Sequence, residues 1–419
     1  MTQLKDVYGI ITFEQYNIKI SVYQVEKQVK HCLYFRSIFL LDSFQDHVKS
    51  HRDAVIRYLR NELMKVETFI GVNVLRYLIL VPDLKMTLNN KLSDEVSFHT
   101  KEQLDNYLKN LSTPDGKVCL NRSITDYIVN EQVQSEMPTQ DVYKVNYIEY
   151  LANKADVTEL CNLIDALQIE PLGFYNNAIA YKNSILDHNK KTRILIDMLD
   201  DCTNIYFYDK NTELYRIVTV EEGKDWLINQ LTEITKLTKE QCINFISAYQ
   251  NIKLINENPI ILNCHCPHYR SLKQLDLNSF KVIVNNLINK YFQIIVDKCD
   301  SIDCESVHFN CDNSIYDCFD YKLNVCQEAF INGIKIETQY QTIVGLEHEN
   351  VANIIWILNG AINEKELLGK AVPCSIDPYF DEHQQERQFN KDIFMKFGIF
   401  LTNFVAKLGG SMDQIWKKS

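Results

Sequence analysis

The chain has 419 residues, 46% hydrophobic and 24% charged, which is typical of a folded globular protein and excludes a disordered or collagen-like chain. Asp and Glu (55) outnumber Lys and Arg (44), and the net charge of -11 argues against a nucleic-acid binder, which needs a basic surface. The 13 cysteines are odd in number, and no apolar export signal opens the sequence. We therefore expect reduced thiols and a cytoplasmic protein.

The first part of the chain predicts strands followed by one helix. The segment 8–13, a short polar turn and the alternating segment 18–22 predict a β-hairpin, and 33–41 predicts a third strand. Residues 47–66 carry apolar side chains at helical spacing, and 73–81 reads as a buried strand.

A more polar stretch with short elements follows from about residue 84. Thr100 is a candidate N-cap, with Gln103 three residues later, for a helix that ends before the turn at 112–116. The strands expected around this helix are 94–98, 117–120, 126–129 and 142–150.

The rest of the chain alternates helices and strands. Helices are expected at 156–167, 171–181, 224–237, 239–250, 280–299 and 391–408. Strands are expected at 193–197, 205–208, 214–219 and 353–358.

This order of elements resembles the actin-like ATPase superfamily and, within it, the FtsA family of bacterial cell-division proteins. The resemblance implies an α/β, actin-like two-lobed fold with an inserted small α+β domain of the FtsA type. It divides the chain into 1–83 (first part of lobe 1), 84–152 (inserted domain), 153–192 (return to lobe 1), 193–219 (core strands of lobe 2), 220–345 (helical subdomain of lobe 2), 346–408 (adenosine-loop region and final helix) and 409–419 (C-terminal tail).

The first phosphate loop of the family resembles D-x-G-[ST]-[ST]-K, and the matching stretch here is Thr12–Asn17, TFEQYN. Thr12 replaces the acid and Glu14 replaces the glycine. Glycines let consecutive backbone amides converge on phosphate oxygens without a side chain in the way. The first loop has therefore lost the features that bind phosphate.

The second phosphate loop of the family resembles D-[IL]-G-G-G-[TS]-T-D, and here it reads MLDDCTN after the leading Asp197. Asp197 and Thr203 remain, but no glycine does, and Asp200 and Asp201 add negative charge where phosphates would lie. A metal is one way to relieve this charge, because carboxylates also hold Mg²⁺.

Two further nucleoside contacts are also altered. The family pattern A-E-x-x-K becomes an apolar segment at 242–246, and the adenosine loop, similar to L-T-G-G-G-S, becomes ILNGAI with one glycine, Gly360. ATP with Mg is the family ligand, and Asp197, Thr203 and Gly360 are what remains of its site. We expect a lost or weakened ATP site, no catalytic residues and no other cofactor.

The resemblance implies a cell-division adaptor that links FtsZ filaments to the cytoplasmic membrane as a polymerising scaffold. The helical subdomain would bind the acidic-hydrophobic FtsZ tail, with Lys236, Lys239 and Lys253 as candidate contacts. The alternatives are an active actin-like ATPase with drifted motifs and a peptide-binding adaptor similar to PilM. No metal site is expected, because Cys264 and Cys266 lack a second pair at zinc spacing.

The C-terminal tail carries a short amphipathic pattern. Met412, Ile415 and Trp416 share one helical face and are followed by Lys417 and Lys418. Trp beside Lys suits the headgroup region of a bilayer. The tail is therefore a candidate anchor to the inner face of the cell membrane, and a packed chain end is the alternative.

Overall fold

The computed structural model describes residues 7–26, 29–40, 43–71, 74, 76–82, 84–139, 142–184, 192–210, 213–247, 261–265, 272–299, 304–320, 323, 330–331, 333–338, 341, 343–346 and 351–366. All of them belong to one compact unit, Met1–Tyr379. The second unit, Phe380–Ser419, lies outside the described residues, and so do the helix expected at 391–408 and the tail.

The first sheet has the strand order β3-β2-β1-β4-β9. Its strands are β1 (Val7–Phe13), β2 (Asn17–Glu26), β3 (Val29–Phe39), β4 (Arg76–Leu80) and β9 (Glu170–Tyr175). The first three form an antiparallel meander, and β4 and β9 continue the sheet in parallel from β1.

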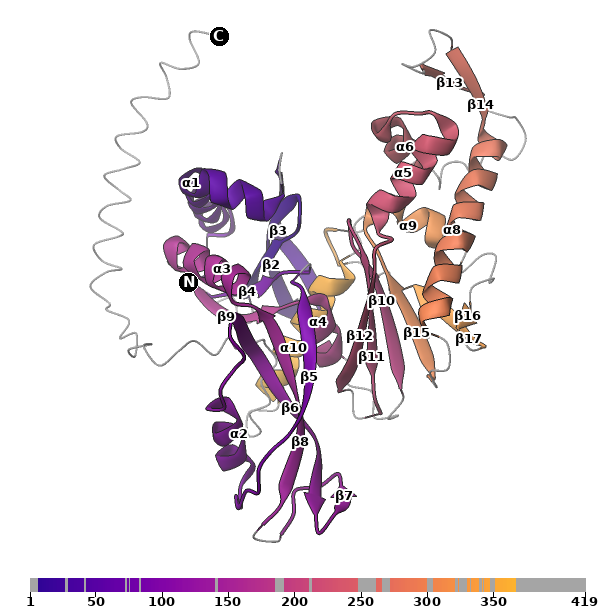
Figure 1. Ribbon diagram of the computed structural model, residues 1–419. Coiled ribbons are helices and arrows are strands. Elements are labelled where there is room, and N and C mark those ends of the chain that lie inside the picture. Colours follow the sequence, from indigo (N-terminus) through magenta and orange to yellow (C-terminus); the bar gives the residue numbers. More distant parts are fainter. Residues whose placement is uncertain are drawn as a thin grey trace, which may run out of the picture. The chain divides into compact units, whose positions relative to one another are not determined.

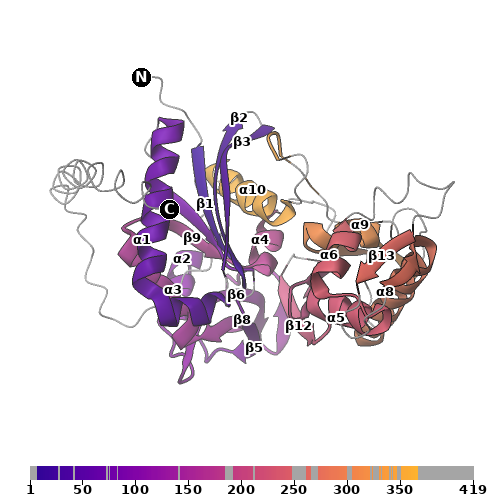
Figure 2. The same ribbon diagram turned by 90° about the horizontal axis from the view of Figure 1, so that it is seen from above.

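Helices cover both faces of this sheet. Buried side chains of α1 (Phe44–Ile70) and α3 (Lys154–Leu167) share one apolar core with β1 and β2. On the other face, α4 (Asn177–Ser184) packs against α10 (Ala352–Glu366). Figure 2 shows α1 on one side of the sheet and α10 on the other. The strands buried on both faces explain the continuous apolar runs in the sequence.

The second sheet repeats the plan of the first, with the order β12-β11-β10-β15-β17-β16 (Figure 1). Its strands are β10 (Arg193–Met198), β11 (Thr203–Tyr208), β12 (Leu214–Val220), β15 (Ser306–Asn310), β16 (Phe330–Ile331) and β17 (Ile334–Thr338). Again an antiparallel meander comes first, and a later strand, β15, pairs in parallel with its first strand.

Four helices contribute to the core of the second sheet: α5 (Lys224–Thr235), α6 (Lys239–Ser247), α8 (Leu277–Cys299) and α9 (Asn313–Asp320). A short hairpin of β13 (Ile261–His265) and β14 (Leu272–Asp276) precedes α8. None of the helices within the described ranges combines the length and apolar composition that crossing a membrane requires.

A separate four-stranded sheet has the order β5-β8-β6-β7. Its strands are β5 (Met86–Leu92), β6 (Lys117–Val129), β7 (Gln132–Gln134) and β8 (Lys144–Asn153), and α2 (Lys101–Lys109) shares a small core with it. The buried Arg122 donates to Glu149 Oε1 at 3.0 Å and to the carbonyls of Leu108 (2.6 Å) and Leu111 (3.0 Å) at the end of α2. Arg122 therefore fixes the helix to the sheet.

Most of the expected elements are confirmed at nearly the expected positions. The hairpin at 8–22, the strands of the second meander and helices α1, α3, α5, α6 and α8 all form. Thr100 caps α2 as predicted, because its hydroxyl accepts from the Gln103 amide at 3.3 Å.

Four of the expected elements are wrong, three of them in the first half of the chain. The strand expected at 94–98 is only an isolated bridge at Val96, and the strand of this region is β5. The two strands expected at 117–129 are one strand, β6, whose register shifts at two irregular points that break its alternation. The helix expected at 171–181 begins only at Asn177, because Glu170–Tyr175 pairs with β4 as strand β9.

The strand expected at 353–358 is also wrong, because these residues lie in helix α10. Residues 354–358 are all buried, so the segment shows no helical alternation of polar and apolar residues. Its three isoleucines also favour a strand by intrinsic preference, which packing against α4 overrides.

Candidate functional site

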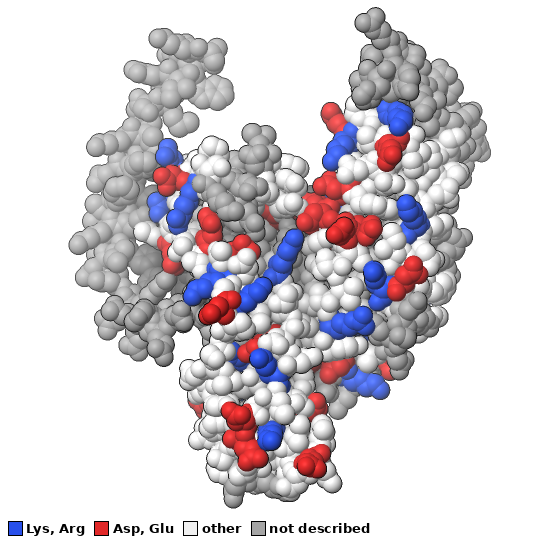
Figure 3. Space-filling view, viewed as in Figure 1, with Lys and Arg blue, Asp and Glu red and all other residues white. Residues whose placement is uncertain are grey.

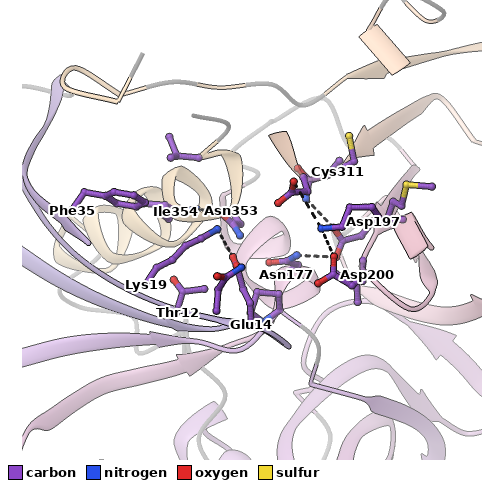
Figure 4. A pocket seen from close by; sticks show the side chains of 18 residues that line it. Thr12, Glu14, Lys19, Phe35, Asn177, Asp197, Asp200, Cys311, Asn353 and Ile354 are labelled. Carbon is purple, nitrogen blue, oxygen red and sulfur yellow. Dashed lines mark hydrogen bonds and ion pairs between the residues drawn. The ribbon is translucent and has the colours of Figure 1, made fainter. Parts of the chain in front are cut away.

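A cavity of about 100 Å³ lies where the first turns of the two meanders meet. Its lining comes from the β1–β2 turn, the β10–β11 turn, the starts of α4, α5 and α10, and the end of β15 (Figure 4). These are the positions at which the resemblance places the phosphate loops. The chemistry of the lining therefore decides what the cavity can bind.

The β1–β2 turn satisfies its own charge. Glu14 stands where the family has glycine, and its carboxylate accepts from Lys19 Nζ at 2.6 Å. Burial raises the pKa of Glu14, and Asp200 and Asp312 raise it further. The Glu14 amide donates to the Asn17 carbonyl at 2.8 Å. The Glu14 amide and the Lys19 ammonium group, which could otherwise bind a phosphate, are therefore bonded within the turn.

The β10–β11 turn is held against the start of α5. The amides of Lys224 and Asp225 donate to the carbonyls of Leu199 (2.9 Å) and Asp200 (2.8 Å). Free amides at a helix start are what makes it an anion site. Here these two amides bind the chain itself.

Gly223 makes this close contact possible. A Cβ atom at this position would lie 2.5 Å from the Cys202 nitrogen and 2.7 Å from the Asp200 carbonyl oxygen. The glycine therefore allows the close approach of one backbone to another.

Lys224 is the second cation of the cavity, and acidic side chains of the chain surround it. Its ammonium group forms an ion pair with Asp200 and lies 3.9 Å from Asp312 Oδ1. Lys224 and the hydrogen bonds from Ser314 lower the pKa of Asp312, although burial opposes them. In Figure 3, acidic side chains gather at this end of the second sheet, below α5.

Asp197 lies at the end of β10 with its carboxylate completely buried. Asn177 Nδ2 donates to Oδ2 and Asn310 Nδ2 donates to Oδ1, both at 2.8 Å (Figure 4). Burial raises the pKa of Asp197 to about 6, and the two amide hydrogen bonds only partly oppose this. Both oxygens of the acid retained from the family motif are thus bound by asparagine amides.

Thr203, the other retained residue of the second loop, does not line the cavity. Its hydroxyl donates to the Glu222 carbonyl at 2.6 Å and lies 2.9 Å from the hydroxyl of Tyr291. It therefore ties the start of β11 to the segment before α5 and to α8.

The loop expected around Gly360 does not exist, because Gly360 lies inside helix α10 and outside the cavity lining. The end of β15 and the turn of Cys311 and Asp312 do line the cavity, and helix α9 follows this turn outside the lining. The sequence pattern that could have located this segment is an apolar strand followed by a helix-capping residue, Asp312. The Asp312 carboxylate caps α9 by accepting from the Ser314 amide at 2.8 Å.

The remaining predicted positions lie apart from the cavity or outside the described residues. Lys236 follows the end of α5 and Lys239 is the first residue of α6, and both side chains are exposed and outside the cavity lining. The ammonium group of Lys239 lies 3.7 Å from Asp225 Oδ1. Lys253, Met412, Ile415, Trp416, Lys417 and Lys418 lie outside the described residues.

The following cysteines of the described ranges are reduced thiols and not disulfides: Cys32, Cys119, Cys161, Cys202, Cys242, Cys299, Cys304, Cys311 and Cys318. In the part of the chain that the structure describes, no three His, Cys, Asp or Glu side chains are grouped as metal ligands.

No family model matches the sequence, and no curated protein does. Among solved structures, the chain is similar to that of the "PilM-PilN type IV pilus biogenesis complex", with 7% identity, a TM-score of 0.50 and coverage of 86% of this chain and 98% of that one. It is also similar to the ethanolamine utilization protein EutJ from Carboxydothermus hydrogenoformans (9% identity, TM-score 0.47, 84% and 89% covered). A third similar structure is MreB5 of Spiroplasma citri bound to ADP (6% identity, TM-score 0.44, 87% and 97% covered). The predicted α/β class is confirmed, and the chain has the actin-like ATPase fold.

Proposed function

We propose that the protein is an actin-like adaptor whose nucleotide cleft is held together by its own side chains. The observation that carries this proposal is the pair of phosphate-loop turns. In both, an acidic side chain of the protein is bound to the lysine beside it: Glu14 to Lys19, and Asp200 to Lys224.

A nucleotide would have to break these pairs and face the acids. A unit like-charge pair at about 4 Å costs about 4 kcal/mol at an effective dielectric constant near 20, and about 1.4 kcal/mol is tenfold in affinity. The cavity of about 100 Å³ is also smaller than the roughly 300–1,000 Å³ of ordinary ligand pockets. We infer that ATP binds weakly or not at all, and that partner binding takes the place of catalysis.

More specifically, we propose that this actin-like adaptor is a cell-division adaptor of the FtsA type. Such a protein would bind the acidic-hydrophobic C-terminal tail of FtsZ, assemble with copies of itself and attach to the inner face of the cell membrane through its tail. The α5–α6 pair exposes two lysines, Lys236 and Lys239, together with the apolar Ile234 and Ile243. Basic and apolar side chains on one helix pair suit an acidic-hydrophobic peptide.

The second candidate is a PilM-like adaptor, favoured by the likeness to the solved PilM–PilN complex at a TM-score of 0.50. Its partner would be a short peptide of a membrane protein. An active ATPase with drifted motifs is the third candidate, and nucleotide titration separates it from both adaptors.

Calorimetry on the full chain tests these proposals. We expect no sub-micromolar binding of ATP with Mg²⁺, and binding of an FtsZ-tail peptide that weakens at least about tenfold in a Lys236→Glu/Lys239→Glu variant. Lys101→Glu, an exposed lysine at the start of α2, is the control and should bind as the wild type does.

Two other outcomes of the same calorimetry would each exclude one of the proposed roles. Tight ATP binding with slow hydrolysis would favour the ATPase. If the FtsZ-tail peptide fails but a cytoplasmic peptide of a membrane protein binds, the PilM-like role replaces the FtsA-type role.

A further inference from the structure

Strand β3 forms one edge of the first sheet and is longer, with 11 residues, than the two strands that precede it. Near its start, the Cys32 amide donates to the Val344 carbonyl at 2.9 Å. Beyond this contact, no residue of the described ranges pairs with the outer side of β3 between Leu33 and Phe39. An unpaired strand edge is a template for one more strand.

The register of the sheet shows which backbone groups of β3 point outward. The Leu40 amide donates to the Tyr16 carbonyl at 2.8 Å, toward β2. Because this direction alternates along an antiparallel strand, every second residue before Leu40 also faces β2. The amides and carbonyls of Phe35, Ser37 and Phe39 therefore point away from the sheet. They offer a donor and an acceptor at every second position, as a strand laid along this edge requires.

Large aromatic side chains are exposed beside this edge. Phe39 is 82% exposed, and Arg36 and Ser37 are also exposed. Helix α1 lies next to β3 (Figure 1) and contributes Phe69, which is 73% exposed. The ring centroid of Phe69 lies 5.9 Å from that of Tyr34 in β3. An added strand would cover apolar surface that the protein leaves in solvent.

The exposed charges of this edge are positive, although the whole chain has a net charge of -11. Arg36 has no acidic partner among the described residues. Lys65 of α1 has a side chain 64% exposed, whereas its partner Glu62 is only 3% exposed. Glu62 accepts from Lys65 at 2.6 Å and from the Tyr34 hydroxyl at 3.3 Å. A partner at this edge therefore meets two basic groups, with the carboxylate buried beneath them.

We propose that the outer edge of β3 binds an extended segment of another protein, with alternating acidic and apolar side chains, which adds a strand to the first sheet. Side chains alternate between the two faces of a strand. The acidic ones would lie beside Arg36 and Lys65 on the α1 face, and the apolar ones beside Phe39 on the opposite face.

A second copy of this chain fits the edge less well. Two β3 strands paired about a twofold axis would bring two basic edges together, and like charges on neighbouring strands are destabilising. The surface belongs to the first sheet, whereas α5 and α6 share the core of the second. The inference therefore goes beyond the proposed function and does not depend on it.

The test measures the fluorescence anisotropy of a labelled peptide, EVEVEVE, titrated with the full chain. We expect saturable binding to the wild type, with slower hydrogen exchange in β3, and binding at least about tenfold weaker to Arg36→Glu. Lys101→Glu makes a comparable charge change at the start of α2 and should bind as the wild type does. The Lys236→Glu/Lys239→Glu variant should also bind normally, because it alters a different surface.

Two methylated peptides test strand addition on the wild type, so this result does not depend on how well a variant folds. One carries N-methyl groups on its valines and the other on its glutamates. Since the amides of alternate residues point to opposite edges of a strand, one version should lose binding and the other should keep it.

Three results would overturn the inference. Equal binding of both methylated peptides would exclude strand addition. Equal binding of KVKVKVK, or an equal loss in Lys101→Glu, would exclude specific recognition of acidic side chains. A wild type that ignores EVEVEVE but dimerises, with slow exchange in β3 at high protein concentration, would replace the peptide by a second copy of the chain.

Discussion

Asn177 donates a hydrogen bond of 2.8 Å to Asp197, and this bond joins α4, which packs with the first sheet, to the last residues of β10 in the second sheet. Asn310 holds the other carboxylate oxygen at 2.8 Å. In a nucleotide-binding cleft a ligand would lie between such groups. In this protein a side-chain bond spans the two sheets directly.

The buried charge of Asp197 should make stability depend on pH. The pKa of Asp197 is about 6 when folded, against 3.8 for the free side chain. The folded state therefore binds the proton more tightly than the unfolded chain does. As pH rises from about 4 to 6, Asp197 lowers the free energy of unfolding by roughly 3 kcal/mol in total. We expect Asp197→Asn to be at least as stable as the wild type at pH 7 and to lack this decline, measured by urea unfolding in EDTA.

Asp197→Ala is the control for that prediction. It removes the charge but also orphans the amides of Asn177 and Asn310, at about 1–3 kcal/mol for each buried donor. Asp197→Asn keeps the hydrogen bonds to Asn310 and Asn177 when the Asn177 side-chain amide rotates by 180°. This rotation presents the Asn177 oxygen, which has no partner among the described residues, to the new amide nitrogen. An Asp197→Asn protein as unstable as Asp197→Ala would contradict the explanation.

His308 should contribute the opposite pH dependence. Burial, together with Arg193, lowers the pKa of His308 from 6.5 to about 4. The unfolded chain then binds the proton more tightly, so this residue lowers stability as pH falls from about 6.5 to 4. We expect His308→Gln to be less sensitive to acid in this window. The same slope in variant and wild type would show that another group causes the acid sensitivity.

The local elements could be predicted because their causes are local. An apolar segment, a polar turn and an alternating segment indicated β1 and β2, helical spacing indicated α1, and a single side-chain cap indicated the start of α2. Helix α10 could not be predicted, because a helix buried on most sides loses its periodic signal.

The site was predictable only in part, for the same reason. The resemblance to the family motifs identified the two turns and named Asp197 as the leading acid of the second loop. Asn177 and Asn310 approach Asp197 from elements 20 and 113 residues away in sequence, and no local pattern signals such contacts. The Lys224–Asp200 pair likewise depends on how the turn packs on α5.

Gly223→Ala should destabilise the protein by about 1–3 kcal/mol, the usual cost of forcing an atom into a close contact. The added Cβ would collide with the backbone at Asp200 and Cys202. Gly223→Ser separates this cause from helix capping, because Ser is a better N-cap than Ala. If the collision decides, both variants lose similar stability by urea unfolding. If Ser restores or raises stability, capping matters more than the close contact.

Arg122→Met should be the most damaging of these changes for the β5-β8-β6-β7 sheet. The side chains of Arg122 and Glu149 are 1% and 2% exposed, so removing the arginine leaves a buried carboxylate without its cation, and the carbonyls at the end of α2 lose their donor. A loss of about 3–5 kcal/mol is expected by urea unfolding, with faster hydrogen exchange in α2. The double variant Arg122→Met/Glu149→Leu removes both charges and should recover part of the loss, since an apolar pair can replace a buried ion pair. A double variant as unstable as the sum of both single variants would show that Arg122 acts through α2 alone.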